Sequence, residues 1–350
     1  AVRFLKTPAI YVHNGKDVLK AVVVVTTDLG ETFYGEDMTL IAALCDPAHG
    51  GEILLRSEAQ WKAHSRSLTI KIGLDRKESK RPACLHVGAK PSNSAPNTEH
   101  GFLPPVVDIW SGAMDQSCGR SVSGLRVERR FTPSVGAVVS LLEDAGDSIS
   151  RHCWDGSQAL AQHINQKVSS ETMNTPSLFG LTLSPGKYQK RHVLELGCGI
   201  GTVGISIAQA IPNCDVVLTD LVEVDDLVRA NIERAKPATR STISFHPLDW
   251  TIPIPPALRD RANHVIIVSE CTYNSDTLRP LVNTIVKLLA HSPDAMVVVI
   301  TKTRHPSESV FFELMDSAQL TSIQSLRLPL PGVPGTGYAD TAADVGLHVF

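Results

Sequence analysis

The stretch Val193–Gly204, with the sequence VLELGCGIGTVG, predicts how the second half of the chain folds. A short apolar run is followed by a loop that contains Gly197, Gly199 and Gly201, and apolar residues at helical spacing begin at Val203. In an open α/β sheet, ligands bind beyond the carboxyl ends of the strands, where glycines let the backbone approach the ligand. We therefore predict a strand, a ligand-binding loop and a helix.

Strands and helices alternate on either side of this segment, as in a parallel sheet covered by helices. The predicted strands are residues 192–196, 215–220, 242–250, 264–270, 295–301, 320–328 and 346–350. Apolar residues at helical spacing lie between strands of this series, but no helical pattern separates the last two. We therefore expect an α/β fold with a doubly wound, Rossmann-like sheet of seven strands that ends in an antiparallel hairpin.

The first part of the chain has a different pattern. Residues 19–27, 38–45, 51–57 and 67–74 are β-like runs, and the last of them alternates apolar and polar residues. Residues 88–124 are rich in Pro, Gly, Ser and Asn without any period, which is typical of a long loop. We predict a small β-rich module over residues 1–87, a linker over 88–124 and the α/β domain over 125–350.

Composition and charge exclude several classes of protein. The 33 basic and 36 acidic residues nearly balance. We therefore expect no strong positive electrostatic potential that would bind nucleic acid or acidic lipid. Apolar runs are of strand length, so we expect neither a secretory leader nor a membrane partner. Seven cysteines without C-x-x-C spacing predict neither a disulfide framework nor a metal site. These features predict a protein of the reducing cytoplasm or nucleus. The sequence leaves the oligomeric state open, and a monomer is expected.

The glycine loop also contains GIGTVG, residues 199–204, which matches the G-x-G-x-x-G pattern that binds a dinucleotide pyrophosphate. Glu195 argues against that ligand, because a carboxylate two residues before Gly197 would repel a pyrophosphate. The same carboxylate suits S-adenosyl-L-methionine, which carries an ammonium and a sulfonium group. Asp220 ends the next strand, where an acid can accept both ribose hydroxyls of either cofactor class. We therefore expect S-adenosyl-L-methionine as the cofactor.

The run from Glu195 to Gly201, E-x-G-x-G-x-G, resembles the first motif of the class I, seven-stranded methyltransferases. Three further stretches resemble the eukaryotic methyltransferase family 16, which includes lysine methyltransferases of elongation factors and of chaperones: HCWDGSQALAQHI at 152–164, PLDW at 247–250 and SECTYN at 269–274. The resemblance covers about residues 130–350. It implies a Rossmann-like methyltransferase that uses S-adenosyl-L-methionine to methylate a lysine of a non-histone protein.

The expected cofactor-binding residues follow from this resemblance: Trp154, Glu195, Gly197, Cys198, Gly199, Gly201, Asp220, Asp249, Trp250 and Ser269. Glu195 and the glycine loop would contact the methionine moiety, and Asp220 would bind the ribose. Asp249 would accept from the adenine amino group, with Trp250 beside the ring, and Trp154 would close over the cofactor. A turn cap for Asp249 and a structural indole for Trp154 remain open. Gly204 is expected to serve helix–strand packing.

The expected catalytic residues are Glu270 and Tyr273. The family pattern is Asp-x-x-Tyr, and this chain has Glu-Cys-Thr-Tyr, so the acid is kept on an arm longer by about 1.5 Å. A nearby carboxylate raises the pKa of a lysine amine, so Glu270 is a poor general base. We expect Glu270 to attract and orient the substrate ammonium and Tyr273 to shape the slot. Alternatively, both are polar groups at a strand end.

Two basic residues, Lys302 and Arg304, follow the fifth strand on the binding side, and either a surface role or a substrate-facing role is open for them. Two other functions also remain open. A small-molecule N-methyltransferase would use the same core and would need a closed pocket. A non-catalytic module could retain the cofactor for stability, and it would be favoured if Glu270 pointed away from the cleft.

Overall fold

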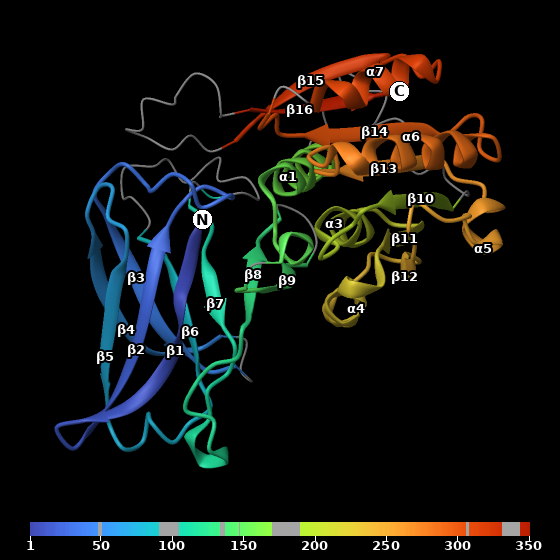
Figure 1. The fold of residues 1–350 in the computed structure, drawn as a ribbon. Helices are drawn as coiled ribbons and strands as arrows, with labels where there is room; N and C mark the ends of the chain where they lie inside the picture. The colour runs from blue at the N-terminus through green and yellow to red at the C-terminus, as the bar shows by residue number, and fades with distance from the viewer. Residues whose placement is uncertain are drawn as a thin grey trace. The chain divides into compact units, whose positions relative to one another are not determined.

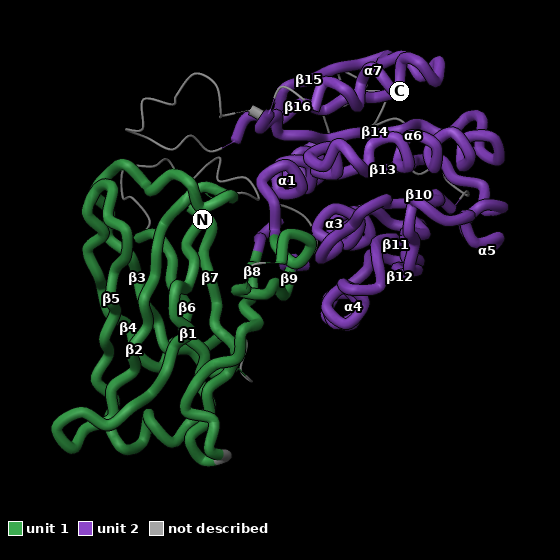
Figure 2. The backbone as a smooth tube through the Cα atoms, viewed as in Figure 1, with its two compact units in different colours: residues 1–130, 140–152, 331–341 green, residues 131–139, 153–330, 342–350 purple. Residues whose placement is uncertain are grey.

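Three β-sheets form the framework of the chain in the computed structural model (Figure 1). The structure describes residues 1–47, 51–90, 104, 106–133, 137–146, 148–169, 190–305, 308–330 and 344–350. These residues divide into two units (Figure 2). Unit 1 contains described residues of the ranges 1–130 and 140–152, and unit 2 contains those of 131–139, 153–330 and 344–350.

Unit 1 is built from two of the sheets. The smaller has the order β1 (Val2–His13), β2 (Lys16–Val25), β5 (Leu68–Leu74), and the larger has the order β4 (Ile53–Trp61), β3 (Met38–Cys45), β6 (Cys84–Ala89), β7 (Ile109–Ser111), β8 (Arg126–Phe131), β9 (Val139–Asp144). Two short 3-10 helices, η1 (Gln116–Cys118) and η2 (Ile149–Arg151), lie in the connections. Leu19, Leu40 and Leu85 belong to one buried cluster that both sheets share.

The expected β-rich N-terminal region is therefore confirmed, but its extent differs from the prediction. Strand β7 lies within residues 88–124, which we expected to be a linker, and it pairs with β6 and β8. The unit also continues past residue 125 to include most of β8 and β9. Each of these short strands pairs with the strand before or after it in the chain, across connections whose composition is that of a loop.

Unit 2 is organised around the seven-stranded sheet. Its order is β12 (Thr242–Pro247), β11 (Cys214–Asp220), β10 (Arg191–Leu196), β13 (Val265–Ser269), β14 (Met296–Thr301), β16 (Asp344–Val349), β15 (Gln324–Pro329). The first five strands are parallel, and β16 is antiparallel to both of its neighbours. This arrangement confirms the predicted α/β sheet with its antiparallel terminal hairpin. The loop expected to bridge the hairpin, residues 331–346, lies mostly outside the described residues.

Helices cover both faces of this sheet (Figure 1). The α-helices are α1 (Asp155–Ser169), α3 (Thr202–Ala210), α4 (Asp225–Arg234), α5 (Pro256–Arg259), α6 (Ser275–Leu289) and α7 (Ser309–Ser317), and the 3-10 helix η3 (Val222–Val224) precedes α4. Apolar residues of α6 and α7, such as Leu281 and Phe311, cluster with Leu194 and Ile266 on one face. Helix α3 packs on the other face of β10 and β11, and α1 contacts α3.

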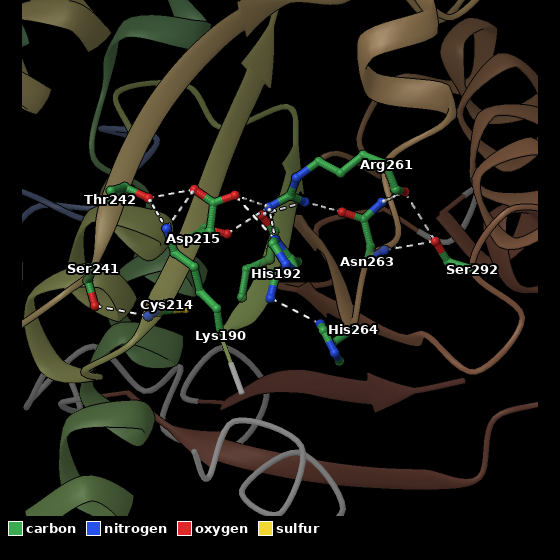
Figure 3. A network of polar contacts seen from close by, with 11 residues as sticks. Lys190, His192, Cys214, Asp215, Ser241, Thr242, Arg261, Asn263, His264 and Ser292 are labelled. Carbon is green, nitrogen blue, oxygen red and sulfur yellow. Dashed lines mark hydrogen bonds and ion pairs between the residues drawn. The ribbon is translucent and has the colours of Figure 1, made fainter. Parts of the chain in front are cut away.

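At the amino ends of β10, β11 and β12, polar side chains tie the strands together (Figure 3). Arg261 donates to Asp215 through Nη2, with 3.0 Å to Oδ2 and 2.8 Å to the backbone oxygen. Thr242 Oγ1 donates to Asp215 Oδ1 at 2.5 Å. Burial raises the pKa of Asp215, but the bonds from Thr242 and Arg261 outweigh it and lower this pKa to about 2. This edge of the sheet is therefore occupied by internal pairs, and the ligand loop lies at the opposite edge.

Gly204 lies where α3 approaches the sheet most closely. A Cβ added there would lie 2.3 Å from Leu218 Cδ2, 2.7 Å from Glu195 Oε2 and 3.0 Å from Val216 Cγ1. These distances are shorter than normal contacts, so a side chain would push the helix off the strands. The predicted role of Gly204 in helix–strand packing is therefore confirmed.

Replacing Gly204 by Ala should destabilise unit 2. Alanine is the better helix former by about 1 kcal/mol, but overpacking a filled interface costs about 1–3 kcal/mol, so we expect a net loss in the free energy of unfolding. Denaturant unfolding followed by circular dichroism measures it. Gly73→Ala is the control, because a Cβ at Gly73 meets nothing within 4 Å. Equal stability of the two variants would show that α3 can move away without cost.

Candidate functional site

The loop after β10 depends on glycine for its shape. Gly197, Gly199 and Gly201 have φ angles of 65°, 54° and 86°, in the left-handed region that favours glycine. Gly201 is the N-cap of α3, and its N–H donates to the carbonyl of Cys198 at 2.8 Å. The N–H of Cys198 donates to the carbonyl of Thr219 at 2.9 Å, which ties the loop to β11. The loop therefore has a fixed turn at the carboxyl end of the sheet.

Asp220, at the end of β11, reaches this loop. Its Oδ2 accepts from the N–H of Gly199 at 2.7 Å, and its Oδ1 accepts from the N–H of Leu221 at 2.7 Å. Burial raises the pKa of the Asp220 carboxyl. Each carboxylate oxygen can accept more than one bond. Asp220 is therefore positioned beside the glycines with acceptor capacity for the hydroxyls of a ligand.

Residues 249 and 250 lie in the turn after β12. Trp250 places its ring edge near Gly197, where an added Cβ would lie 3.2 Å from Trp250 Cζ2. Its Nε1 is buried and has no hydrogen-bond partner among the described residues. Asp249 Oδ1 accepts from the N–H and the hydroxyl of Thr251 at 2.8 and 2.7 Å. The turn-cap role of Asp249, which the sequence left open, is therefore present, and its contact with adenine stays a prediction.

Glu195 faces α3 and is almost completely buried, at 1% exposure. Its Oε2 accepts from the N–H of Gly204 at 2.9 Å. Burial raises the pKa of this carboxyl to about 8, so the group is mostly protonated at neutral pH. The sequence argument against a pyrophosphate assumed a charged carboxylate. The structure weakens that argument, because in this chain Glu195 carries little charge before any cation lies beside it.

The end of β13 packs against the glycine loop. Cys271 Sγ lies 3.5 Å from the carbonyl oxygen of Gly197, and a Cβ on Gly197 would lie 2.4 Å from this sulfur. Burial raises the pKa of Cys271 well above its usual value, which marks a packing thiol and not a nucleophile. Ser269 Oγ lies 2.9 Å from Ser157 Oγ of α1. Ser269 is therefore beside the loop but engaged with α1.

Glu270 follows β13 with a left-handed backbone, φ 58°, and is 7% exposed. Its Oε2 forms an ion pair with Arg304 Nη1. Its Oε1 lies against the first turn of α1, where a Cβ on Gly156 would be 1.8 Å away. The charge of Glu270 therefore has an internal partner in the structure. The expected attraction of a substrate ammonium to Glu270 stays a prediction.

Two expected site residues, Tyr273 and Trp154, belong to the segments that contain this acid and its partner Arg304 or contact them. Tyr273 is 53% exposed, whereas the preceding residues 270–272 are buried. Trp154 precedes α1, and the guanidinium carbon of Arg304 lies 5.6 Å from the centroid of its ring. Lys302 Nζ lies 2.7 Å from Asp155 Oδ2. Both basic residues after β14 are thus paired with acids of unit 2.

Sequence reasoning missed Asp155 and Gly156 as parts of this region. Both lie in the stretch HCWDGSQALAQHI that carries the resemblance, but nothing in that stretch indicates a partner near residue 302 or 270. The expected absence of a metal site stays a prediction. Among the described residues, no cluster of three or more His, Cys, Asp or Glu could hold a metal ion. None of the helices in these residues has the length and apolar composition that crossing a membrane requires.

The residues brought together here fit S-adenosyl-L-methionine on two observations. The Asp220 carboxylate lies at the glycine loop with acceptor capacity for ribose hydroxyls. The indole of Trp250 lies beside the same loop, and its N–H is buried without a partner among the described residues, as expected of a group that a ligand would satisfy. The loop Gly197–Gly201, Asp220 and Trp250 would therefore hold the cofactor.

The raised pKa of Glu195 predicts a pH dependence of stability. Between the ordinary value of 4.5 and about 8, the folded state keeps a proton that the unfolded state releases, so the free energy of unfolding falls as pH rises through this window. The slope approaches about 1.4 kcal/mol per pH unit for one proton. Glu195→Gln keeps an acceptor for Gly204 without titrating, so it should lose this part of the slope.

Denaturant unfolding at pH 5.5, 6.5 and 7.5 measures the difference between the wild type and Glu195→Gln. Glu313→Gln, an exposed change on α7, is the control and should keep the wild-type slope. Identical slopes for all three proteins would show that Glu195 is ionised in the folded state at neutral pH.

Comparison with known proteins agrees with the geometry of the site. A family model described as lysine methyltransferase, methyltransferase family 16, matches residues 135–318, more than half of the chain. The UPF0665 family protein C23C4.06c of Schizosaccharomyces pombe is 24% identical over 318 residues, which are 89% of this chain and 90% of that protein.

Solved structures with a limited likeness to this chain include methyltransferases. The N-methyltransferase NodS from Bradyrhizobium japonicum, in complex with S-adenosyl-L-homocysteine, is 16% identical and covers 55% of this chain and 97% of its own, with a TM-score of 0.35. SMU.776, a putative methyltransferase complexed with SAH, is 11% identical and covers 63% of this chain and 55% of its own, with a TM-score of 0.40. The family match carries the assignment: the chain belongs to the lysine methyltransferase family and is a methyltransferase whose cofactor is S-adenosyl-L-methionine.

Proposed function

We propose that the protein methylates the side-chain amine of a lysine in a non-histone protein. The observation that carries this proposal is the position of Tyr273, which is 53% exposed directly beyond the buried residues 270–272 and two residues after Cys271, whose Sγ lies 3.5 Å from the carbonyl oxygen of Gly197 in the glycine loop. An aromatic ring at an open position can receive an ammonium or a methylated amine on its face. A protein side chain can reach such a position from outside.

The chain's own residues supply binding and orientation. The glycine loop lets its backbone approach the ligand, and Asp220 accepts from ligand hydroxyls. When bound, S-adenosyl-L-methionine supplies a methyl group that its sulfonium already activates. The protein therefore needs no nucleophile of its own, and holding the amine in line with the methyl group provides most of the acceleration.

The substrate amine must lose a proton before it can react. A lysine amine with a pKa near 10.4 is mostly protonated at pH 7.4, and exposing its lone pair costs about 4 kcal/mol. A desolvated slot lowers the pKa of a lysine, and burial raises the pKa of the Tyr273 hydroxyl at this position. We propose that the proton leaves to water and that the substrate is met in the cytoplasm or nucleus, as the composition predicts.

Methyl transfer can be tested with labelled cofactor and a cell extract. We expect the wild type to label a protein, and acid hydrolysis of that protein to release methylated lysine. Asp220→Ala should weaken cofactor binding by about 1.5–3 kcal/mol, the range for hydrogen bonds to a charged group, and should reduce labelling in proportion. Asp316→Ala, an exposed change on α7, is the matched control and should leave both unchanged. Isothermal calorimetry measures the affinity.

Other outcomes identify other functions. Label that appears in the small-molecule fraction would make the protein a small-molecule methyltransferase. Cofactor binding without any labelled product would favour a non-catalytic module. Methylation of a protein residue other than lysine would reject lysine as the substrate and would leave the proposed methyl transfer to a protein in place.

A further inference from the structure

The ion pair between Glu270 and Arg304 is enclosed and anchored. The two side chains are 3% and 17% exposed. Arg304 Nη1 also donates to the carbonyl of Lys302 at 3.2 Å. The backbone N–H of Arg304 donates to Glu308 Oε1 at 3.0 Å, and Glu308 is itself 5% exposed. Both the backbone and the side chain of Arg304 are therefore held in place, so its guanidinium has a fixed position beside Glu270.

The same pair joins three elements that surround the end of β13. Glu270 itself extends from β13, and its Oε1 presses on Gly156 in the first turn of α1. Arg304 comes from the residues after β14 and lies beside the ring of Trp154. The ion pair of Lys302 with Asp155 connects the same two segments a second time. The position of the Glu270 carboxylate is therefore determined from several sides.

The charge state of this carboxylate matters for an amine that binds nearby. An unneutralised carboxylate would stabilise the ammonium form and oppose loss of the proton, whereas a carboxylate paired with a cation exerts a much weaker field. A guanidinium keeps its charge at every working pH. In the described part of the chain, the charged and titratable groups near Glu270 include Asp155 of α1, Cys271 and Tyr273 after β13, and Lys302, Arg304 and Glu308 after β14. Asp220 and Glu195 act on the neighbouring Cys271.

We propose that Arg304 is a positioning residue that keeps Glu270 in an internal ion pair, so that the substrate amine meets no unneutralised acid and gives up its proton. The inference rests on the proposed lysine methylation and deepens it. According to this inference, Arg304 controls the protonation state of the substrate amine that accepts the methyl group. Glu270 then orients Arg304 and α1, and the ammonium is not its partner.

The pH dependence of kcat tests this role, because kcat reports the ionisation of the bound substrate. In Arg304→Met, the uncompensated acid should move the rise of kcat to higher pH by about one unit, a tenfold change in the ionisation ratio. The double variant Arg304→Met/Glu270→Gln should return the midpoint toward the wild type. Arg304→Lys keeps a cation and should stay near it, and Arg279→Met, an exposed change on α6, is the matched control.

A purely structural role for Arg304 predicts a different result: kcat falls at every pH while the midpoint stays in place. That result in a folded Arg304→Met variant would overturn the inference. So would a midpoint in the double variant that remains as high as in the single one. If Arg304→Met does not fold, Glu270→Gln decides the question, because the guanidinium, no longer opposed by the Glu270 carboxylate, should lower the midpoint below that of the wild type. An unmoved midpoint in that variant would overturn the inference.

The pair itself can be measured without any methyl transfer. Removing one partner leaves the other charge buried, so each single variant should unfold at lower denaturant, and the double variant should lose less than the sum of the two. Additive losses would mean that the two residues are not coupled, and the inference would fail. If the wild type binds cofactor and shows this coupling but methylates no lysine, the proposed function fails and the inference falls with it. If lysine methylation is found and the midpoints coincide, the inference fails alone.

Discussion

The close packing of α3 on β10 and β11 is the constraint on which the ligand loop depends. At Gly204 the helix lies so near the sheet that its N–H reaches the buried Glu195 at 2.9 Å. This approach fixes the start of α3 at Gly201 and, through the left-handed turn before it, directs the N–H of Gly199 to Asp220. A larger residue at 204 would move the helix and, with it, the loop that the cofactor requires.

Glu195, Asp220 and Glu270 all carry a carboxyl group at this edge of the sheet. Their surroundings differ, and so do the protonation and the pairing of these groups. Burial among apolar groups leaves Glu195 mostly protonated at neutral pH. Burial raises the pKa of Asp220, and the two backbone N–H groups that donate to it only partly offset this effect. Glu270 is charged against Arg304. The chemistry that each acid can perform therefore depends on its neighbours. Its position in or after a strand does not by itself identify its role.

The sequence predicted the strands and helices of unit 2 well, because their apolar residues recur at regular spacing over long segments. Even the direction of Glu195 follows from the period of two: Leu194 and Leu196 face α6, so the residue between them faces α3. Strand β1 was missed because it contains Pro8, and its pairing is irregular between Lys6 and Ala9. The ion pair of Asp155 with Lys302 spans 147 residues, and no local pattern encodes such a contact.

The replacement of the family's Asp by Glu270 fits its local surroundings. A backbone at φ 58° sends the side chain toward α1, where Gly156 leaves room for the carboxylate and Arg304 meets it. An aspartate would draw the carboxylate back by about 1.5 Å, away from both. The longer acid, the glycine and the arginine therefore form a matched set. Because Arg304 already pairs with the acid, Tyr273, at 53% exposure, is the more open of the two expected catalytic residues after β13.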